Sequence, residues 1–229
     1  MITLNENEKL LYGFHNDYLV DFTLDNQKIT IHREVAAPLQ KLIAALTKND
    51  LKIVIVSHWR SFDHQASIWQ QKWQGKRPLL NKSGDQVDSS KLSQKEKFDA
   101  LCYWSAIPGT SRHHWGTDLD IFLKAPVDAG HSIQLVQSEF DKSGVCAELN
   151  DWLTNNLLSF DFSRPYQQDR GGVCPEPWHI SYRPVADQLI TQMNTETIAK
   201  LIESHPQLDQ QVIVPELKNY LKQFVYNID

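Results

Sequence analysis

Two segments of the chain carry side chains that could hold a metal ion. The first is Pro108–Ile121. It contains two histidines and two aspartates within eight residues, on a stretch where proline and glycine exclude a regular helix. On a straight strand, His113 and Asp120 would lie about 23 Å apart at ~3.3 Å per residue, too far for one ion. The chain must therefore fold back between them, and Gly116 can form the turn because glycine accepts a positive φ.

The second segment is Cys174–Tyr182, in which Glu176 and His179 are three residues apart. A regular strand would point these two side chains to opposite faces, but Pro177 disturbs the pleat and lets both face one site. Two imidazoles and one carboxylate are the three-ligand set of a catalytic zinc ion, whose fourth position takes water. A further glutamate beside that water is what a hydrolase requires.

Together these segments resemble the D-alanyl-D-alanine carboxypeptidase family of zinc peptidases, which shares its fold with the hedgehog signalling domain. The family motif Ser-x-His-x-x-Gly-x-Ala-x-Asp corresponds here to Ser111, His113, Gly116 and Asp120. The later family motif, Glu-Pro-Trp-His, corresponds to residues 176–179. An upstream element, residues 57–61 followed by Gln65, is similar to the family's Ser-x-Tyr-Arg-Ser and its later Gln. The resemblance covers roughly residues 35–185.

The resemblance implies a zinc-dependent D-alanyl-D-alanine carboxypeptidase that hydrolyses the terminal bond of peptidoglycan stem peptides with one Zn²⁺ per chain. The implied metal ligands are His113, Asp120 and His179. The implied general base is Glu176, and Arg60 is the second implied catalytic residue. The implied substrate-binding residues are Ser111, Arg60 and Gln65.

Two departures from the family pattern and three alternative functions bear on this prediction. Asp118 stands where the family usually has Ala, on the same strand face as Asp120, so it is either a carboxylate that orients a ligand or an alternative ligand. Trp59 replaces the usual Tyr. A peptidoglycan endopeptidase with the same zinc site and a non-catalytic zinc-stabilised binding module both remain open. A serine hydrolase is excluded because the chain has no Gly-x-Ser-x-Gly elbow.

Helices and short strands alternate irregularly along the chain, which favours an α+β fold. We expect a small antiparallel sheet flanked by helices, hedgehog/DD-peptidase-like, with a C-terminal helical appendage. One domain is predicted over residues 1–229, with a core at about 35–185. The predicted helices cover residues 34–48, 62–73, 93–104, 146–158, 185–203 and 215–226, and the predicted strands 51–56, 117–123 and 178–182. Residues 75–90 read as a surface loop that could form a mobile flap.

The composition narrows the class of protein. No apolar run approaches the ~18 residues that span a bilayer. Lys and Arg number 23 against 28 Asp and Glu, so the net charge of -5 offers no basic surface for phosphates and makes nucleic acid an unexpected partner. The expected partner is a peptidoglycan stem peptide or another D-Ala-D-Ala-type peptide. The first ten residues do not read as a secretory signal, so the chain as written is expected in the cytoplasm, or in the periplasm if a signal has been removed.

Overall fold

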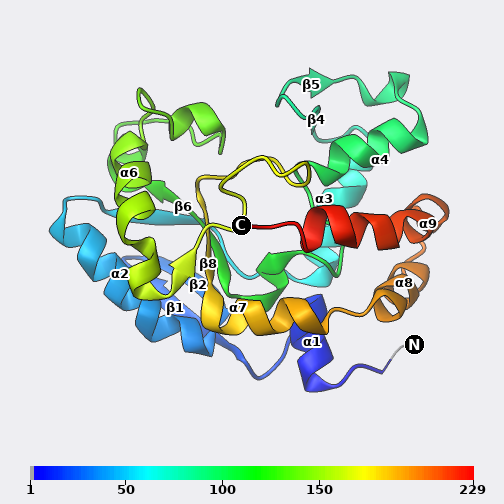
Figure 1. Cartoon of the computed structure of the whole chain (residues 1–229), viewed down its shortest axis with the longest axis horizontal. Helices are drawn as coiled ribbons and strands as arrows, with labels where there is room; N and C mark the ends of the chain where they lie inside the picture. The colour runs from blue at the N-terminus through cyan, green and yellow to red at the C-terminus, as the bar shows by residue number, and fades with distance from the viewer. Residues whose placement is uncertain (1–2) are drawn as a thin grey trace.

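The chain folds as short strands interleaved with helices, and the computed structural model describes residues 3–229 (Figure 1). The strands are β1 (Leu19–Leu24), β2 (Gln27–His32), β3 (Ile53–Ser57), β4 (Leu79–Leu80), β5 (Gln86–Val87), β6 (Asp118–Leu123), β7 (Phe162–Ser163) and β8 (His179–Tyr182). The α-helices are α1 (Glu6–Tyr12), α2 (Ala36–Lys48), α3 (Phe62–Trp73), α4 (Gln94–Cys102), α5 (Lys124–Asp128), α6 (Ala147–Asn156), α7 (Arg183–Leu189), α8 (Thr195–Glu203) and α9 (Gln210–Tyr220).

The main sheet is antiparallel and has four strands in the order β3–β6–β8–β7. Strand β6 lies inside the sheet, and its first five residues are buried because both of its faces are covered. The register places Asp120 of β6 opposite Ser57 of β3 on one side and opposite His179 of β8 on the other. Strand pairing thus brings together residues that lie far apart in the sequence.

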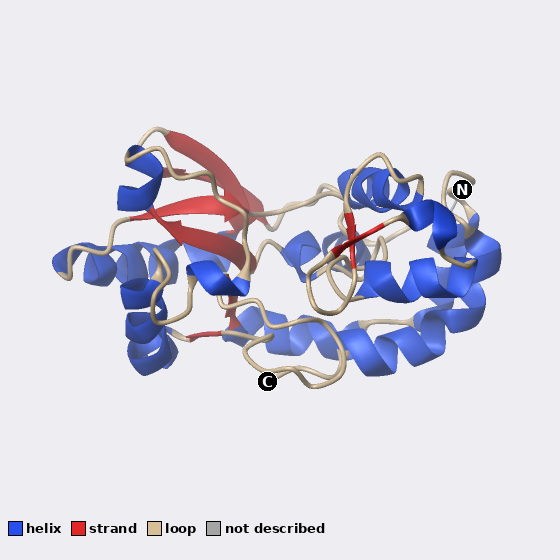
Figure 2. Cartoon of the chain, turned by 90° about the horizontal axis from the view of Figure 1, so that it is seen from above, coloured by secondary structure: helices blue, strands red, loops and turns tan. Residues whose placement is uncertain are grey.

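Helices surround this sheet and build the core. Helix α2 buries Leu39, Leu42 and Leu46, one apolar stripe at helical spacing. Figure 2 shows most of the strands toward one end of the molecule, with helices beside them, and a further group of helices toward the other end. No helix in the described part of the chain combines the length and the apolar character needed to cross a bilayer.

The C-terminal helices pack against the middle of the chain, where α9 contacts α4 and α8. The Tyr220 hydroxyl is buried and accepts a hydrogen bond from the Ile107 backbone N–H at 3.2 Å. It also lies 3.0 Å from the Thr110 hydroxyl. The predicted appendage therefore supports the loop that leads into the first metal-ligand motif.

The predicted α+β fold with a small antiparallel sheet is confirmed, and the helix predicted at 62–73 has the same bounds as α3. The helix predicted at 185–203 is divided into α7 and α8, because the chain leaves the helix at Met193 and a new helix starts after the capping residue Asn194. Helix α1 and the β1–β2 hairpin were not predicted.

Residues 75–90, predicted as a loop and a mobile flap, contain the β4–β5 hairpin. Its Leu79 is buried, and the Trp104 indole N–H donates to the Asn81 carbonyl at 2.8 Å. Lys82 pairs with Asp169 at 2.8 Å, so the hairpin also contacts the segment before the second metal-ligand motif. The loop prediction was incomplete here, while mobility of the segment stays a prediction.

Candidate metal centre

A tight reversal of the chain places His113 beside β6. Residues 112–115 form a 3₁₀ turn that ends at Gly116, whose φ is 68°. A Cβ at this position would lie 2.6 Å from the His32 backbone nitrogen, so a side chain would clash there in addition to its backbone strain. The predicted turn at Gly116 is confirmed, and it brings His113 and Asp120 to the same site.

A second turn and the sheet register bring in His179. The His179 backbone N–H donates to the Glu176 carbonyl at 3.0 Å, which closes a turn directly before β8. His113, Asp120 and His179 each offer one ligand atom, and these three atoms lie within 4.8 Å of one another. All three residues are buried. The structure therefore brings together the three predicted metal ligands.

Hydrogen bonds orient both imidazole rings toward Asp120. The Nδ1 of His113 lies 3.1 Å from the Asp118 backbone carbonyl, which leaves Nε2 at 3.4 Å from Asp120 Oδ2. The His179 ring is turned the other way: its Nε2 lies 2.9 Å from Asp118 Oδ1, and its Nδ1 lies 3.3 Å from Asp120 Oδ1. Each ring thus has one nitrogen held by the protein and the other free to bind a metal, as in other histidine metal sites.

The residues at this site fit a divalent cation. Asp120 Oδ1 and His179 Nδ1 are buried without a hydrogen-bond partner in the described chain, and such unpaired atoms are unfavourable unless a ligand meets them. Burial would lower the pKa of His179, but Asp118, Asp120 and Glu176 together raise it well above its ordinary value. The surrounding carboxylates thus favour positive charge here. Two imidazole nitrogens and one carboxylate oxygen are typical ligands of catalytic zinc.

Asp118 orients one of the predicted ligands. Its side chain is fully buried, and it accepts hydrogen bonds from Arg112 Nε at 2.7 Å and from the Thr117 hydroxyl at 2.5 Å, besides its contact with His179. Burial would raise the pKa of Asp118, but Arg112 and His179 hold it well below its ordinary range. Of the two roles that the sequence left open, the geometry favours the carboxylate that orients His179.

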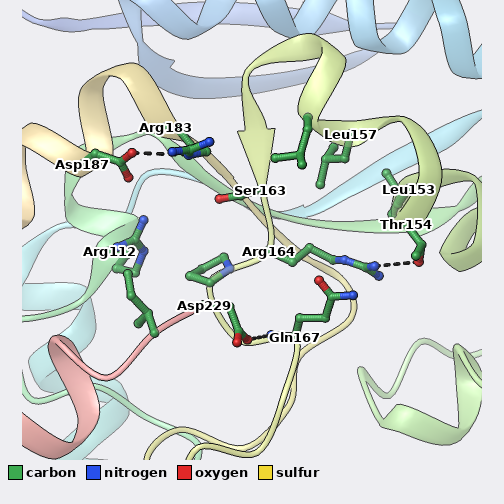
Figure 3. A pocket seen from close by; sticks show the side chains of 13 residues that line it. Arg112, Leu153, Thr154, Leu157, Ser163, Arg164, Gln167, Arg183, Asp187 and Asp229 are labelled. Carbon is green, nitrogen blue, oxygen red and sulfur yellow. Dashed lines mark hydrogen bonds and ion pairs between the residues drawn. The ribbon is translucent and has the colours of Figure 1, made fainter.

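Arg112 connects this network to a separate part of the molecule. It donates from its second terminal nitrogen to the Ser181 hydroxyl at 2.6 Å, and its guanidinium lies 4.8 Å from the Trp115 ring. It also borders a cavity of about 380 Å³ on the side of Arg164 and Arg183, shown in Figure 3. These two arginines have partners of their own there, Thr154 and Asp187.

Glu176 lies next to the predicted ligands and faces a pocket of about 280 Å³. Its Oε2 is 3.2 Å from His179 Nδ1. Its backbone N–H donates to the Tyr166 carbonyl at 2.8 Å, which fixes the main chain at this point. The carboxylate is therefore close to the metal position without being one of the three converging ligands, as a general base must be.

Arg60 borders the same pocket and is held by two neutral acceptors. Its terminal nitrogens donate to Gln65 Oε1 and to Ser57 Oγ, each at 2.8 Å. Gln65 is 1% exposed, and its amide nitrogen donates to the Ala106 carbonyl at 2.7 Å. Gln65 was predicted to contact substrate, but both ends of its amide are hydrogen-bonded within the protein, and the residues that line the pocket do not include it. The structure thus indicates that Gln65 positions Arg60.

The pocket wall contains one more predicted residue and several that were not predicted. Ser111 lines it, as the substrate-binding prediction requires. Side chains in the wall that were not predicted include Lys72, Leu80, Trp104, Ser105, Gln134, Leu135 and Tyr166. A sequence signal existed for Lys72, which lies seven residues after Gln65 and therefore on the same face of α3. His114 does not line the pocket, since its ring is buried between the Arg60 carbonyl and the Gly109 N–H, and burial lowers its pKa to about 3.

Two histidines and an aspartate that converge in a pocket, with a glutamate beside them, are the arrangement of a zinc metallopeptidase. Residues 28–185 match the family model described as D-alanyl-D-alanine carboxypeptidase, VanY. The match covers more than half of the chain, so the chain belongs to the D-alanyl-D-alanine carboxypeptidase family, a family of D,D-peptidases.

Individual relatives are similar to parts of the chain. An uncharacterised protein of Haemophilus influenzae is 35% identical over 130 residues, which are 56% of this chain and 96% of the relative. A D-alanyl-D-alanine carboxypeptidase of Enterococcus faecalis is 26% identical over 147 residues, 63% of this chain and 45% of the relative.

Solved structures show the same fold. The vancomycin-resistance D,D-pentapeptidase VanY from a VanB-type cassette, solved in complex with Zn(II), is 25% identical with a TM-score of 0.50, over 81% of this chain and 94% of that protein. The LD-carboxypeptidase LdcB has a TM-score of 0.53 at 19% identity, over 95% of this chain and 88% of that protein. The second likeness concerns the fold alone.

Proposed function

We propose that this protein is a zinc-dependent D-alanyl-D-alanine carboxypeptidase that removes the terminal residue of peptidoglycan stem peptides. The observation that carries the proposal is the convergence of His113, Asp120 and His179 in one pocket with Glu176 at 3.2 Å from the His179 ring. The Zn(II) complex of the VanY D,D-pentapeptidase supports zinc as the metal. The family of the chain supports the D-Ala-D-Ala substrate.

The chain's own residues account for the proton transfers and for charge stabilisation. When bound, zinc would act as a Lewis acid and lower the pKa of a water molecule to ~7. Glu176 accepts a proton from the attacking water and returns it to the leaving amine nitrogen. The hydrogen-bond partners of Arg60, Gln65 and Ser57, are neutral and do not offset its positive charge. Arg60 can therefore stabilise the negative charge that develops on the carbonyl oxygen.

The direct test is incubation of the zinc-loaded protein with a defined pentapeptide muropeptide, with products identified by mass. We expect the loss of a single terminal D-Ala, and no product after the metal has been chelated. Cleavage inside the stem would replace the proposal by the endopeptidase alternative. Binding of the stem without any cleavage would favour the non-catalytic module.

Replacement of Glu176 separates chemistry from metal binding. We expect Glu176→Ala to keep its zinc, because the three converging ligands are unchanged, and to lose at least ~10²-fold in kcat through loss of the general base. Zinc content by elemental analysis and turnover on the same preparation provide the measurement. A variant that remained fully active would show that another group takes the proton.

A further inference from the structure

Lys72 is a half-buried cation in the substrate pocket, and no carboxylate of the described chain forms an ion pair with it. It lies in the last turn of α3 and lines the pocket together with Arg60 and Glu176. In the described part of the chain its ammonium group has one hydrogen-bond partner, the neutral Ser105 hydroxyl at 2.7 Å, and no carboxylate in ion-pair contact. Since an ammonium ion has three N–H donors, two remain available to a ligand.

The cost of burying the Lys72 ammonium group without a counter-ion indicates what kind of ligand it would bind. Burial without a counter-ion is unfavourable for a charged side chain, and here it lowers the pKa of Lys72 to about 8. A helix end offers many ways for a lysine to reach water, and Lys76, a few residues further on, is exposed. Lys72 instead turns into the pocket, where an anionic group of the substrate would complete its surroundings.

The position of Lys72 along the pocket identifies that group. Burial lowers the pKa of Arg60 while Asp120 and Glu176 both act to raise it, whereas Glu176 is the acidic neighbour that acts on Lys72. Lys72 and Glu176 line the same pocket. Glu176 delivers its proton to the leaving amine, so the leaving residue lies in the pocket that Glu176 and Lys72 both line. In a carboxypeptidase the leaving residue carries the terminal carboxylate, one carbon atom away from that amine.

We propose that Lys72, held by Ser105, binds the terminal carboxylate of the substrate peptide and thereby makes the enzyme select free C-termini. This inference rests on the proposed function and assigns separate tasks to the two pocket cations. Arg60 faces the carbonyl oxygen that becomes negative, and Lys72 faces the carboxylate that is negative from the start. A peptide whose C-terminus is neutral would leave the half-buried Lys72 without an anionic partner.

The test compares two substrates that differ in one group: a peptide ending in D-Ala-D-Ala as the free acid and the same peptide as the C-terminal amide. The enzymes are the zinc-loaded full chain, Lys72→Met, which keeps the side-chain length, and Lys72→Arg, which keeps the charge. We expect the wild-type protein to prefer the acid. The acid-to-amide ratio of kcat/KM should fall about 10- to 100-fold in Lys72→Met, the range for one charge-assisted hydrogen bond.

Controls and a binding measurement keep the outcome independent of turnover. The matched control is Lys76→Met, an exposed lysine near the same helix end, which should keep the wild-type ratio. Lys72→Gln repeats the loss of charge if the Met variant does not fold. In a Glu176→Gln background, where we expect both peptides to stay intact, calorimetry should give a Kd ratio between acid and amide that falls by a similar factor when Lys72→Met is added.

Each result has a definite consequence. A ratio in Lys72→Met equal to that of the wild type, or a wild-type protein with no preference for the acid, overturns the role of Lys72 and leaves the peptidase proposal intact. Failure of the wild type to cleave either peptide overturns the proposed function. The calorimetric comparison then still decides whether Lys72 binds a terminal carboxylate.

Discussion

Asp118 and Asp120 project from the same face of β6, two residues apart. They differ in the hydrogen-bond partners of their carboxylate oxygens. Asp118 is saturated by Arg112, Thr117 and His179, while Asp120 keeps a buried oxygen without a partner. A carboxylate with free oxygen atoms can bind a cation, and a saturated one can only orient its neighbours. The two residues should therefore respond differently to replacement.

We expect Asp120→Ala to lose zinc, because only two protein ligands would remain. Asp118→Ala should still bind zinc, with affinity weaker by about 10- to 100-fold because His179 loses the group that orients it. Asp118→Ala should also be less stable by about 3–5 kcal/mol, because Arg112 becomes a buried charge without its partner. Elemental analysis, chelator competition and denaturant unfolding measure these effects. Full zinc content in Asp120→Ala together with loss in Asp118→Ala would show that their roles are reversed.

Lys72 gives the selectivity for free C-termini a pH dependence. Burial lowers its pKa to about 8, while Glu176 acts to raise the pKa and Arg60 and Arg77 act to lower it further. Lys72 is charged below this pH and neutral above it, so the preference for the acid over the amide peptide should be full near pH 7. It should decline as pH rises through about 8.

The measurement is the acid-to-amide ratio of kcat/KM from about pH 6.5 to about pH 9.5, a range that brackets the titration of a lysine whose pKa burial has lowered. In Lys72→Arg the decline should vanish from this range, because arginine stays protonated. A decline that persisted in the arginine variant would have to come from another group. Using the ratio cancels titrations that affect both peptides, including those near the metal.

At the scale of elements, the loop between α5 and α6 reaches the pocket in a constrained conformation. Leu135 lines the pocket with a φ of 52°, a backbone conformation that bulky residues rarely adopt. The buried carboxylate of Glu139 holds the loop: it accepts hydrogen bonds from the backbone N–H groups of Gln134 and Val136, both at 3.1 Å, and contacts the His131 ring at 2.7 Å. The contacts of Glu139 thus stabilise a strained segment of the pocket wall.

We expect Glu139→Gln to loosen this wall, because an amide group cannot accept hydrogen bonds from donors on both of its ends. KM for the stem peptide should rise by about 5-fold for each 1 kcal/mol of substrate-binding free energy that is lost. The kcat value should change little because the metal ligands and Glu176 are untouched. The matched control is Glu148→Gln, an exposed residue on α6. An unchanged KM in Glu139→Gln would show that Leu135 does not contribute to substrate binding.

Elements with a strong local pattern could be predicted from the sequence. Helix α3 begins at its capping residue Ser61 and has the predicted bounds, and the turn at Gly116 follows from glycine chemistry. The β1–β2 hairpin was missed, although its alternating residues and the Asp25–Asn26 turn are a hairpin signal. Local patterns indicate which elements form, and they say less about how the elements meet.

The site shows the same division. The metal-ligand motifs could be found because each is a local arrangement of residue types. Gln65 was assigned to substrate because nothing in the sequence shows that its amide is taken up by Arg60 and Ala106. Lys72 was not predicted, because a helix end is normally exposed and its hydrogen-bond partner, Ser105, lies 33 residues away. Packing between distant segments decides both cases.

At the scale of the whole molecule, the predicted ligands come from three separate segments. His113 lies in a 3₁₀ turn, Asp120 on β6 and His179 on β8, and the loop before the turn is supported by Tyr220 of α9. A bound metal would link these segments in the folded chain, and the unfolded chain does not hold them together. Metal binding should therefore stabilise the entire fold against unfolding.

We expect the unfolding temperature of the metal-free protein to rise when zinc is added, since a ligand that binds the folded state stabilises it by RT ln(1 + [L]/Kd), about 2.7 kcal/mol at 100 times Kd. For a chain of this size that corresponds to a shift of roughly 5–10 °C. Glu176→Ala should show the same shift because it retains the three ligands, whereas Asp120→Ala should show little of it. Differential scanning calorimetry at several zinc concentrations makes the comparison. A shift of equal size in Asp120→Ala would mean that zinc binds elsewhere, and the metal centre would have to be reassigned.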